Sequence, residues 1–294
     1  MQFLHTSLPY ILAGISVGGQ YALIAIGYTM VYGILRLINF AHGDVFMVAG
    51  LVMVYTTAAL PIYISIPIVL VATVLLGLLI ERVAYKPLRT APRMSVMISA
   101  IGVSYLLQNC ALYFTGGLPQ VYPEIPFLSR SVTIFGATTK MVTVITPILT
   151  IILVVLLVML INHTKIGMAM RAVSKDFETS QLMGVCINSV ISVTFAIGCF
   201  LAAVGSLLYF TNYTSVIPTS GAMPGLKAFV AAVFGGIGSI PGAVIGAVVI
   251  GICENLIKAA GYTAFSDAFT FALLIVVLLF KPTGLFGEKT AEKV

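Results

Sequence analysis

Long apolar stretches separated by short polar breaks dominate the pattern of this chain. A helix needs about 20 apolar residues to cross a bilayer, because it rises about 1.5 Å per residue through about 30 Å of hydrocarbon. The pattern predicts spans at Leu8–Gly33, Ile62–Ile80, Ser95–Phe114, Met141–Ile161, Ile187–Phe210 and Asp267–Phe280. Three other apolar stretches are short for a full crossing, namely Val45–Leu60, Gly225–Phe234 and Ala243–Ile257. We therefore expect an all-α, polytopic transmembrane helical bundle in which some helices are broken or re-entrant.

Composition supports a single integral-membrane domain over residues 1–294. Sixty per cent of the residues are hydrophobic and 8% are charged, whereas a soluble domain carries about 25% charged residues. The net charge of +6 comes from basic residues in short loops, which is typical of an oriented membrane protein and does not indicate nucleic-acid binding. The first apolar stretch lacks a basic leader and a small-residue cleavage site, so we expect it to be retained.

The basic residues also predict the orientation of the chain. The positive-inside rule places Arg36, the Arg82–Arg93 loop, the Lys165–Lys175 loop and the tail from Lys281 on the cytoplasmic side. The N-terminus is then outside and the C-terminus inside. Residues 225–257 must leave and return to the same side, either as a re-entrant hairpin, which we favour, or as two short passes.

Two polar breaks occupy comparable positions and suggest two pseudo-repeated halves. Asn39–Asp44 follows a long span, Gly235–Gly242 follows a half-length stretch, and each precedes a short one. Interrupted segments at matching positions of two halves indicate a transport pathway, because broken backbone at membrane depth must be buried in protein or line water. Ordinary interfacial turns are the alternative. The candidate pathway residues are Asn39, His42, Asp44, Gly235, Gly236, Gly238 and Gly242.

Charged residues near these breaks allow more than one role. Asp44 suits a cap on the helix that follows, and we rank this role above substrate contact. His42 suits an interior histidine better than a proton carrier. Glu254 and Lys258 have i, i+4 spacing and are predicted to pair near the membrane interface, whereas an acid buried in the bilayer would indicate function.

Two longer polar segments are predicted to face opposite sides of the membrane. Residues 115–140 form an outward loop with a hairpin around Phe135-Gly136. Residues 162–186 form a segment in which Ser174 or Asp176 caps a short amphipathic helix that ends at Gly184. Such a helix can dock into a groove on a soluble partner; the alternative is a helix lying on the lipid surface. The candidate coupling residues are Arg171, Lys175, Asp176, Glu178 and Gly184.

Other patterns bear on packing and chemistry. Small residues at four-residue spacing, as in Gly14/Gly18 and Ala243/Ala247, predict closely packed helices. The chain has no GxxxxGK[ST] motif, no HExxH motif and no clustered set of metal ligands or nucleophiles. Its four cysteines lack metal-binding spacing. The sequence therefore predicts a non-catalytic subunit without a cofactor of its own.

Three motifs together resemble the branched-chain amino-acid permeases of LivH type. They are Arg36-Leu-Ile-Asn-Phe-Ala-His-Gly-Asp44, Gly167-Met-Ala-Met-Arg-Ala172 and the glycine-rich stretch from Gly235 to Gly246. Glu178-Thr-Ser-x-x-x-Gly184 is also similar to the EAA-x-x-x-G coupling loop of permeases in ATP-binding-cassette (ABC) importers, with Thr179 and Ser180 in place of the two alanines. The likeness extends from about Leu8 to Phe286.

The resemblance implies a role and a set of partners. It implies a permease subunit in the bacterial cytoplasmic membrane that imports leucine, isoleucine and valine. It also implies a sister permease of LivM type, two cytoplasmic ABC ATPases that bind the ATP, and an extracytoplasmic substrate-binding protein. Urea and short-chain amide importers share these motifs, and ribose-type permeases do so more distantly. An ion-coupled secondary transporter using His42, Asp44 or Glu254 is the competing class.

Overall fold

The computed structural model describes residues 2–89, 91–134, 137–281 and 283–287. Its main helices are α1 (Gln2–Leu35), α2 (His42–Ala59), α3 (Ile62–Ile80), α4 (Arg93–Thr115), α5 (Met141–His163), α8 (Ile187–Asn212), α9 (Ala222–Gly235), α10 (Ile240–Ala259) and α11 (Ser266–Phe280). Two short helices, α6 (Lys165–Lys175) and α7 (Phe177–Leu182), connect α5 to α8. Within the described ranges, eight helices are long and apolar enough to cross a membrane. The predicted all-α polytopic bundle is confirmed.

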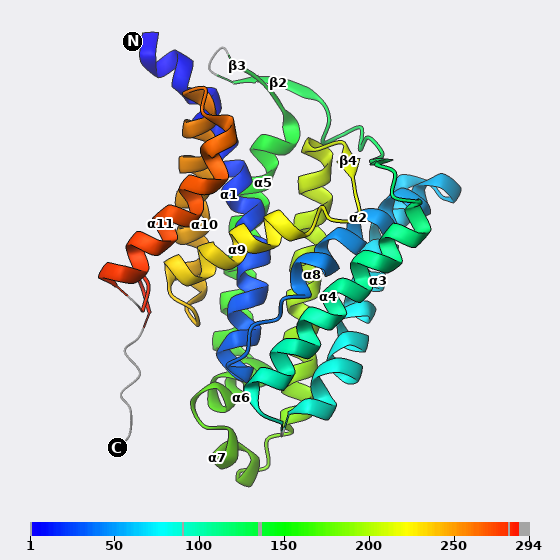
Figure 1. Ribbon diagram of the computed structural model, residues 1–294, viewed down its shortest axis with the longest axis vertical. Coiled ribbons are helices and arrows are strands. Elements are labelled where there is room, and N and C mark those ends of the chain that lie inside the picture. The colour runs from blue at the N-terminus through cyan, green and yellow to red at the C-terminus, as the bar shows by residue number, and fades with distance from the viewer. Residues whose placement is uncertain (1, 90, 135–136, 282, 288–294) are drawn as a thin grey trace.

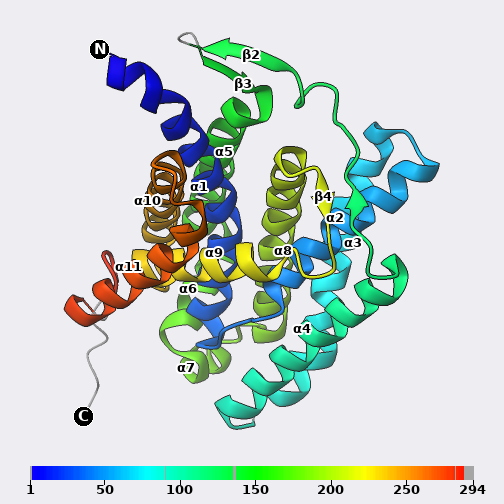
Figure 2. The ribbon, with the colours of Figure 1, turned by 45° about the horizontal axis from the view of Figure 1, so that its top comes forward.

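Helices α1 and α8 form the centre of the bundle. Helices α2, α3 and α4 lie on one side of this pair, and α10 and α11 lie on the other (Figure 1). Helix α9 crosses in front of α1 at a steep angle in both views (Figures 1 and 2). Most side chains of the central helices are buried, whereas only a small share of those of α4, α5 and α11 is. The exposed apolar surfaces of these outer helices suit contact with lipid or with another membrane subunit.

Glycine residues bring α1 and α10 into backbone contact. A Cβ atom added at Gly14 would come within 2.7 Å of the Ile252 Cα, and one at Gly18 within 2.7 Å of the Val248 Cα. On the facing helix, a Cβ at Gly251 would meet the backbone of both glycines. Close approach through small residues is how helices associate in lipid, where apolar burial gives little driving force. The predicted tight packing is confirmed at Gly14 and Gly18.

The structure corrects the lengths of two apolar stretches. Helix α2 begins at His42 and has 18 residues, and α10 begins at Ile240 and has 20, so both are candidates for a full span. Sequence reasoning started each helix too late, because it assigned the first turn to the preceding polar break. Only α9, with 14 residues, stays short among these three. Helix α9 turns into α10 at residues 236–239, and a Cβ at Gly246 would lie 2.5 Å from the Ala231 carbonyl oxygen, so the two helices are packed neighbours. The re-entrant hairpin stays a prediction.

The polar segments lie at opposite ends of the bundle. Strands β2 (Ser131–Ile134) and β3 (Ala137–Lys140) pair antiparallel and lie at the same end as the start of α1 (Figure 1). The paired strands confirm the expected hairpin, although its tip at residues 135–136 lies outside the described residues. Strand β1 (Gln120–Val121) pairs with β4 (Ser215–Val216), which ties this loop to the end of α8. Helices α6 and α7 lie at the other end (Figures 1 and 2).

Candidate functional site

A cavity of about 350 Å³ lies between α1, α2, α4 and α9. Its size falls within the range of small-molecule sites, about 300–1,000 Å³. Asp44, Ser104 and Gln108 contribute polar groups to its wall, and Ile101, Leu226 and Phe229 contribute apolar ones. Part of its rim is exposed, since Ile101, Tyr105 and Leu226 all retain accessible surface. The cavity is therefore a half-open pocket on the flank of the bundle.

Glycines allow α2 and α9 to meet at the base of this cavity. A Cβ atom at Gly43 would lie 2.7 Å from the Gly221 carbonyl oxygen, and one at Gly225 would lie 2.9 Å from the Gly43 Cα. No larger residue fits between the two backbones without moving them apart. The N-terminal ends of both helices consequently converge on one wall, and each presents the positive end of its helix dipole.

Asp44 is the acidic residue of this cavity, and its role differs from the predicted cap. The cap position of α2 is Ala41, and no side chain caps the helix there. Instead, the buried Asp44 carboxylate accepts a hydrogen bond from the Ser104 hydroxyl and another from the Gln108 amide, whose Nε2 lies 3.0 Å from Oδ1. Both donors come from α4, and their position relative to Asp44 depends on how the two helices pack.

His42 and Asn39 lie buried behind the cavity wall. The His42 ring packs edge-on against Tyr28, with centroids 5.0 Å apart, and fits a space that a side chain at Gly27 would fill. The Asn39 Oδ1 accepts a hydrogen bond of 2.7 Å from the Tyr85 hydroxyl. These contacts fit the interior role expected for His42 and make Asn39 a link between the first break and the helix that follows α3.

The second break lies away from the cavity that Asp44 lines. Gly236 and Gly238 have φ angles of +107° and +100°, which side chains other than glycine rarely adopt. The chain after α11 packs against this turn, and the Phe286 amide donates to the Gly235 carbonyl at 2.9 Å. A Cβ at Gly242 would meet the Gly235 carbonyl. Thus the structure brings Asn39, His42 and Asp44 together, whereas the second break contacts the C-terminal segment through Gly235, Gly236 and Gly242. Gly238 lies in the same turn.

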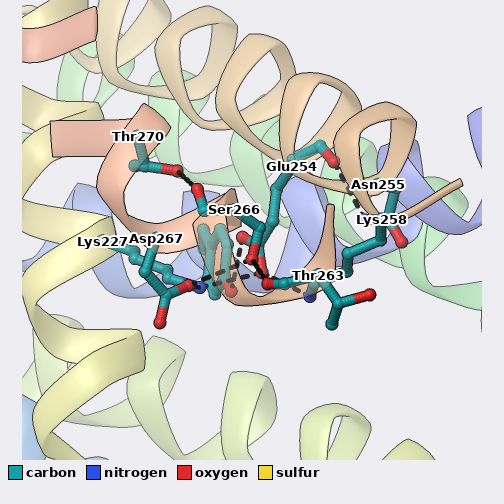
Figure 3. Close-up of polar contacts among 10 residues, drawn as sticks. Lys227, Glu254, Asn255, Lys258, Thr263, Ser266, Asp267 and Thr270 are labelled. Atoms are coloured by element: carbon teal, nitrogen blue, oxygen red, sulfur yellow. Dashed lines mark hydrogen bonds and ion pairs between the residues drawn. The ribbon is translucent and has the colours of Figure 1, made fainter. Parts of the chain in front are cut away.

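A buried ionic cluster fixes α9 to its neighbours (Figure 3). The Glu254 Oε1 on α10 lies 2.8 Å from the Lys227 Nζ on α9 and 2.6 Å from the Lys258 Nζ. Lys227 also pairs with Asp267 of α11 at 2.6 Å, and the Tyr21 hydroxyl of α1 donates to Glu254 at 3.1 Å. The Glu254–Lys258 pair is confirmed, and Glu254 is 1% exposed; the place of the pair near the membrane interface stays a prediction. Sequence reasoning missed Lys227, whose partner lies 27 residues away.

Helices α6 and α7 form an exposed segment whose caps match the sequence. The Asp176 carboxylate accepts a hydrogen bond from the Thr179 amide at 3.0 Å and begins α7. Gly184, with φ of +83°, ends it, and the Val185 amide donates to the Ser180 carbonyl at 3.1 Å. This six-to-one bond closes the helix as glycine stops commonly do.

The side chains of this segment divide into anchored and free groups. Arg171 is exposed, but its guanidinium donates to the Ile161 carbonyl at 2.6 Å and to Asn162 at 2.9 Å, so it ties α6 to α5. Lys175 and Glu178 are exposed. Leu182 and Met183 are 87% and 81% exposed, which leaves two large apolar side chains projecting at the end of α7. The free groups could contact a partner, whereas Arg171 has a structural contact of its own.

One contact joins this segment to the first break. The Arg36 guanidinium, just after α1, donates to the Ser174 carbonyl of α6 at 3.3 Å. On its other face, α6 buries Met170 and Val173 in the cluster of apolar residues that includes the end of α1. A displacement of α6 would therefore act on the chain that leads to Asn39.

Comparison with known proteins identifies the family. Residues 10–278 match the model of the branched-chain amino acid transport system permease component. The chain belongs to this family. It is 42% identical to the high-affinity branched-chain amino acid transport permease LivH of Escherichia coli K12, with 100% of this chain and 99% of that protein covered. LivH of Salmonella typhimurium is 40% identical with the same coverage, and BraD of Pseudomonas aeruginosa is 38% identical over 98% of each chain. The permease is accordingly a multi-pass membrane component of a transport system.

Proposed function

We propose that this permease is one of two membrane subunits of an ABC importer for branched-chain amino acids. The family assignment and the full-length likeness to LivH and BraD support this role. In the proposed complex, a sister permease completes the pathway and two cytoplasmic ATPases bind and hydrolyse ATP. A substrate-binding protein delivers the amino acid from outside. The permease then resides in the bacterial cytoplasmic membrane, with the β2–β3 hairpin outside and α6–α7 inside.

The observation that carries the coupling part of this proposal is the exposure of α7. Leu182 and Met183 project from a capped helix, with Glu178 one turn before them. Large apolar side chains that dock into a groove provide most of the energy of such an interface. We assign the docking contacts to Lys175, Glu178, Leu182 and Met183, with Asp176 and Gly184 fixing the helix and Arg171 anchoring α6 to α5.

Transmission from α7 to the pathway follows from packed contacts. ATP-driven closure of the ATPases moves α6 and α7 as a unit, because Asp176 joins them through a single cap residue. The Arg36–Ser174 hydrogen bond then carries the movement to the first break. The movement then reaches the first break, which holds Asn39, His42 and Asp44, beside the cavity that Asp44 lines. It also reaches the glycine turn from Gly235 to Gly242, where α9 meets the C-terminal segment. Helix α9 spans between these two regions.

Reconstitution with and without partners tests the proposal. The chain is co-expressed with candidate ATPases and a sister permease, purified, and placed in proteoliposomes with the binding protein. We expect leucine uptake that requires ATP. Uptake by the chain alone, without ATP or partners, would instead establish a secondary transporter, and ATP-dependent uptake of urea or short amides without leucine uptake would reassign the substrate.

A single substitution tests the docking surface. Leu182→Asp replaces an exposed apolar side chain by a charge and should cost more than about 2 kcal/mol of docking energy, as removal of an interface anchor does. The assembled ATPases should then be lost on purification or hydrolyse ATP without uptake. Leu182→Met keeps an apolar side chain of similar volume and serves as the control. Equal coupled uptake by both variants would place the docking surface elsewhere.

A further inference from the structure

The cavity wall contains a buried carboxylate that lacks a cationic partner. Asp44 is 2% exposed and lies in the first turn of a membrane-spanning helix. Among the described residues, no lysine, arginine or histidine lies within ion-pair distance of it, whereas the buried Glu254 has two lysine partners. An acid at membrane depth is costly and normally pairs with a cation. The unpaired carboxylate therefore points to a positively charged ligand.

Neighbouring groups fix the orientation of the Asp44 carboxylate and offset part of the cost of burying its charge. The Ser104 hydroxyl donates to Oδ2, and the Gln108 amide donates to Oδ1 from 3.0 Å. The positive end of the α2 dipole adds to the stabilisation of negative charge. Each carboxylate oxygen can accept two hydrogen bonds. Two donors from α4 therefore leave acceptor capacity for a group that enters the cavity.

The remaining walls suit the other parts of a small aliphatic amino acid. Ile101, Leu226 and Phe229 form an apolar surface next to the polar group. Gly221 and Ala222, at the start of α9, also line the cavity. The positive end of the α9 dipole there favours a carboxylate. One cavity thus places an anion, an apolar wall and a helix N-terminus around a volume of about 350 Å³.

We propose that Asp44, held by Ser104 and Gln108, binds the α-ammonium group of the transported amino acid while its aliphatic side chain contacts Ile101, Leu226 and Phe229. This inference rests on the proposed function and adds the site within the membrane. The binding protein selects the substrate outside, and Asp44 receives its positive charge during passage. A half-open cavity fits such transient binding, because a substrate that must leave cannot be fully enclosed by one subunit.

The same geometry allows one other role, a purely structural link between α2 and α4. Substitution of Gln108 separates the two, because its side chain lies against the carboxylate. Gln108→Lys places a tethered ammonium at Asp44, where it strengthens a structural link but occupies a site for the substrate ammonium. Gln108→Met has a similar length, supplies no charge and loses the hydrogen bond. The two roles therefore predict opposite orders of activity.

The test measures ATP-dependent leucine uptake by the fully assembled complex in proteoliposomes. We expect Asp44→Asn to lower uptake at least about thirtyfold, since a hydrogen bond to a charged group is lost. Gln108→Met should lose about threefold in uptake, and Gln108→Lys should lose at least about thirtyfold although its thermal stability is retained.

Uptake by Gln108→Lys that equals or exceeds that of Gln108→Met would overturn the proposal, as would normal uptake by Asp44→Asn. If Asp44→Asn fails to assemble, the order of the two Gln108 variants decides. Absence of ATP-dependent leucine uptake by the unaltered complex would instead reject the proposed function.

Discussion

Replacing Glu254 by glutamine tests the energetic role of the buried ionic cluster. The carboxylate accepts hydrogen bonds from the Lys227 and Lys258 ammonium groups and from the Tyr21 hydroxyl. Glutamine keeps the shape and one acceptor oxygen but removes the charge. Among the described residues, the buried Lys227 then retains a charged partner only in Asp267, whose side chain is 45% exposed and therefore less effective.

The size of the loss follows from these contacts. Removing one member of a buried ion pair costs about 3–5 kcal/mol, because the remaining charge is left without compensation. The retained contact between Lys227 and Asp267 offsets part of this cost, so we expect Glu254→Gln to lower the free energy of unfolding by about 3 kcal/mol. Lys258→Met should cost less, about 1 kcal/mol, because the Lys258 side chain is 29% exposed and partly hydrated.

Unfolding by sodium dodecyl sulphate in mixed micelles, followed by far-ultraviolet circular dichroism, gives these free energies. Glu124→Gln, at an exposed position in the loop between α4 and α5, is the matched control and should change stability little. The double variant Lys227→Met/Glu254→Gln should recover at least about 1 kcal/mol relative to Glu254→Gln, since it removes the uncompensated ammonium. A loss below about 0.5 kcal/mol for Glu254→Gln, or an equal loss for Lys258→Met, would refute the assignment of the cluster as a buried stabilising network.

Two further predictions concern packing and the first break. Gly251→Ala places a methyl group 2.5 Å from backbone atoms of α1 and should lower the free energy of unfolding by about 1–3 kcal/mol through overpacking. The same unfolding titration measures this loss. Gly102→Ala is the control, because a Cβ there has nothing within 4 Å, and it should leave stability unchanged or slightly raised. Tyr85→Phe leaves the buried Asn39 oxygen without its 2.7 Å hydrogen bond and should cost about 1–3 kcal/mol, whereas Tyr63→Phe, at an exposed position, should cost almost nothing. A fully stable Tyr85→Phe variant would mean that Asn39 is held by other groups.

Features that depend on neighbours along the chain could be predicted from the sequence. The apolar stretches around Ile62–Ile80, Met141–Ile161 and Ile187–Phe210 correspond closely to α3, α5 and α8. The cap at Asp176 and the stop at Gly184 depend on groups three to five residues away, so they too were predictable. Local reasoning failed at Ile240 and His42, because apolar residue counts do not reveal a helix that begins inside a glycine-rich or polar break.

The family motifs located the breaks but not the chemistry around them. Asp44 was recognised as a candidate, yet its partners on α4 lie 60 and 64 residues away. No local pattern connects these positions. Likewise, the spacing of Glu254 and Lys258 predicted their pairing but gave no sign of Lys227, which approaches from α9.

The sequence by itself determined the membrane class, most of the spans and the capped helix at Phe177–Leu182, since run length and short-range hydrogen bonding decide these features. Only the tertiary structure decided that Asp44 lines a cavity, that Glu254 is buried, and that α9 crosses the bundle. These outcomes depend on the rotation and crossing of packed helices. Close contacts at Gly43, Gly221 and Gly251 set how these helices pack. Such packing depends on the shapes of both helix surfaces in contact, so neither segment's own sequence determines it.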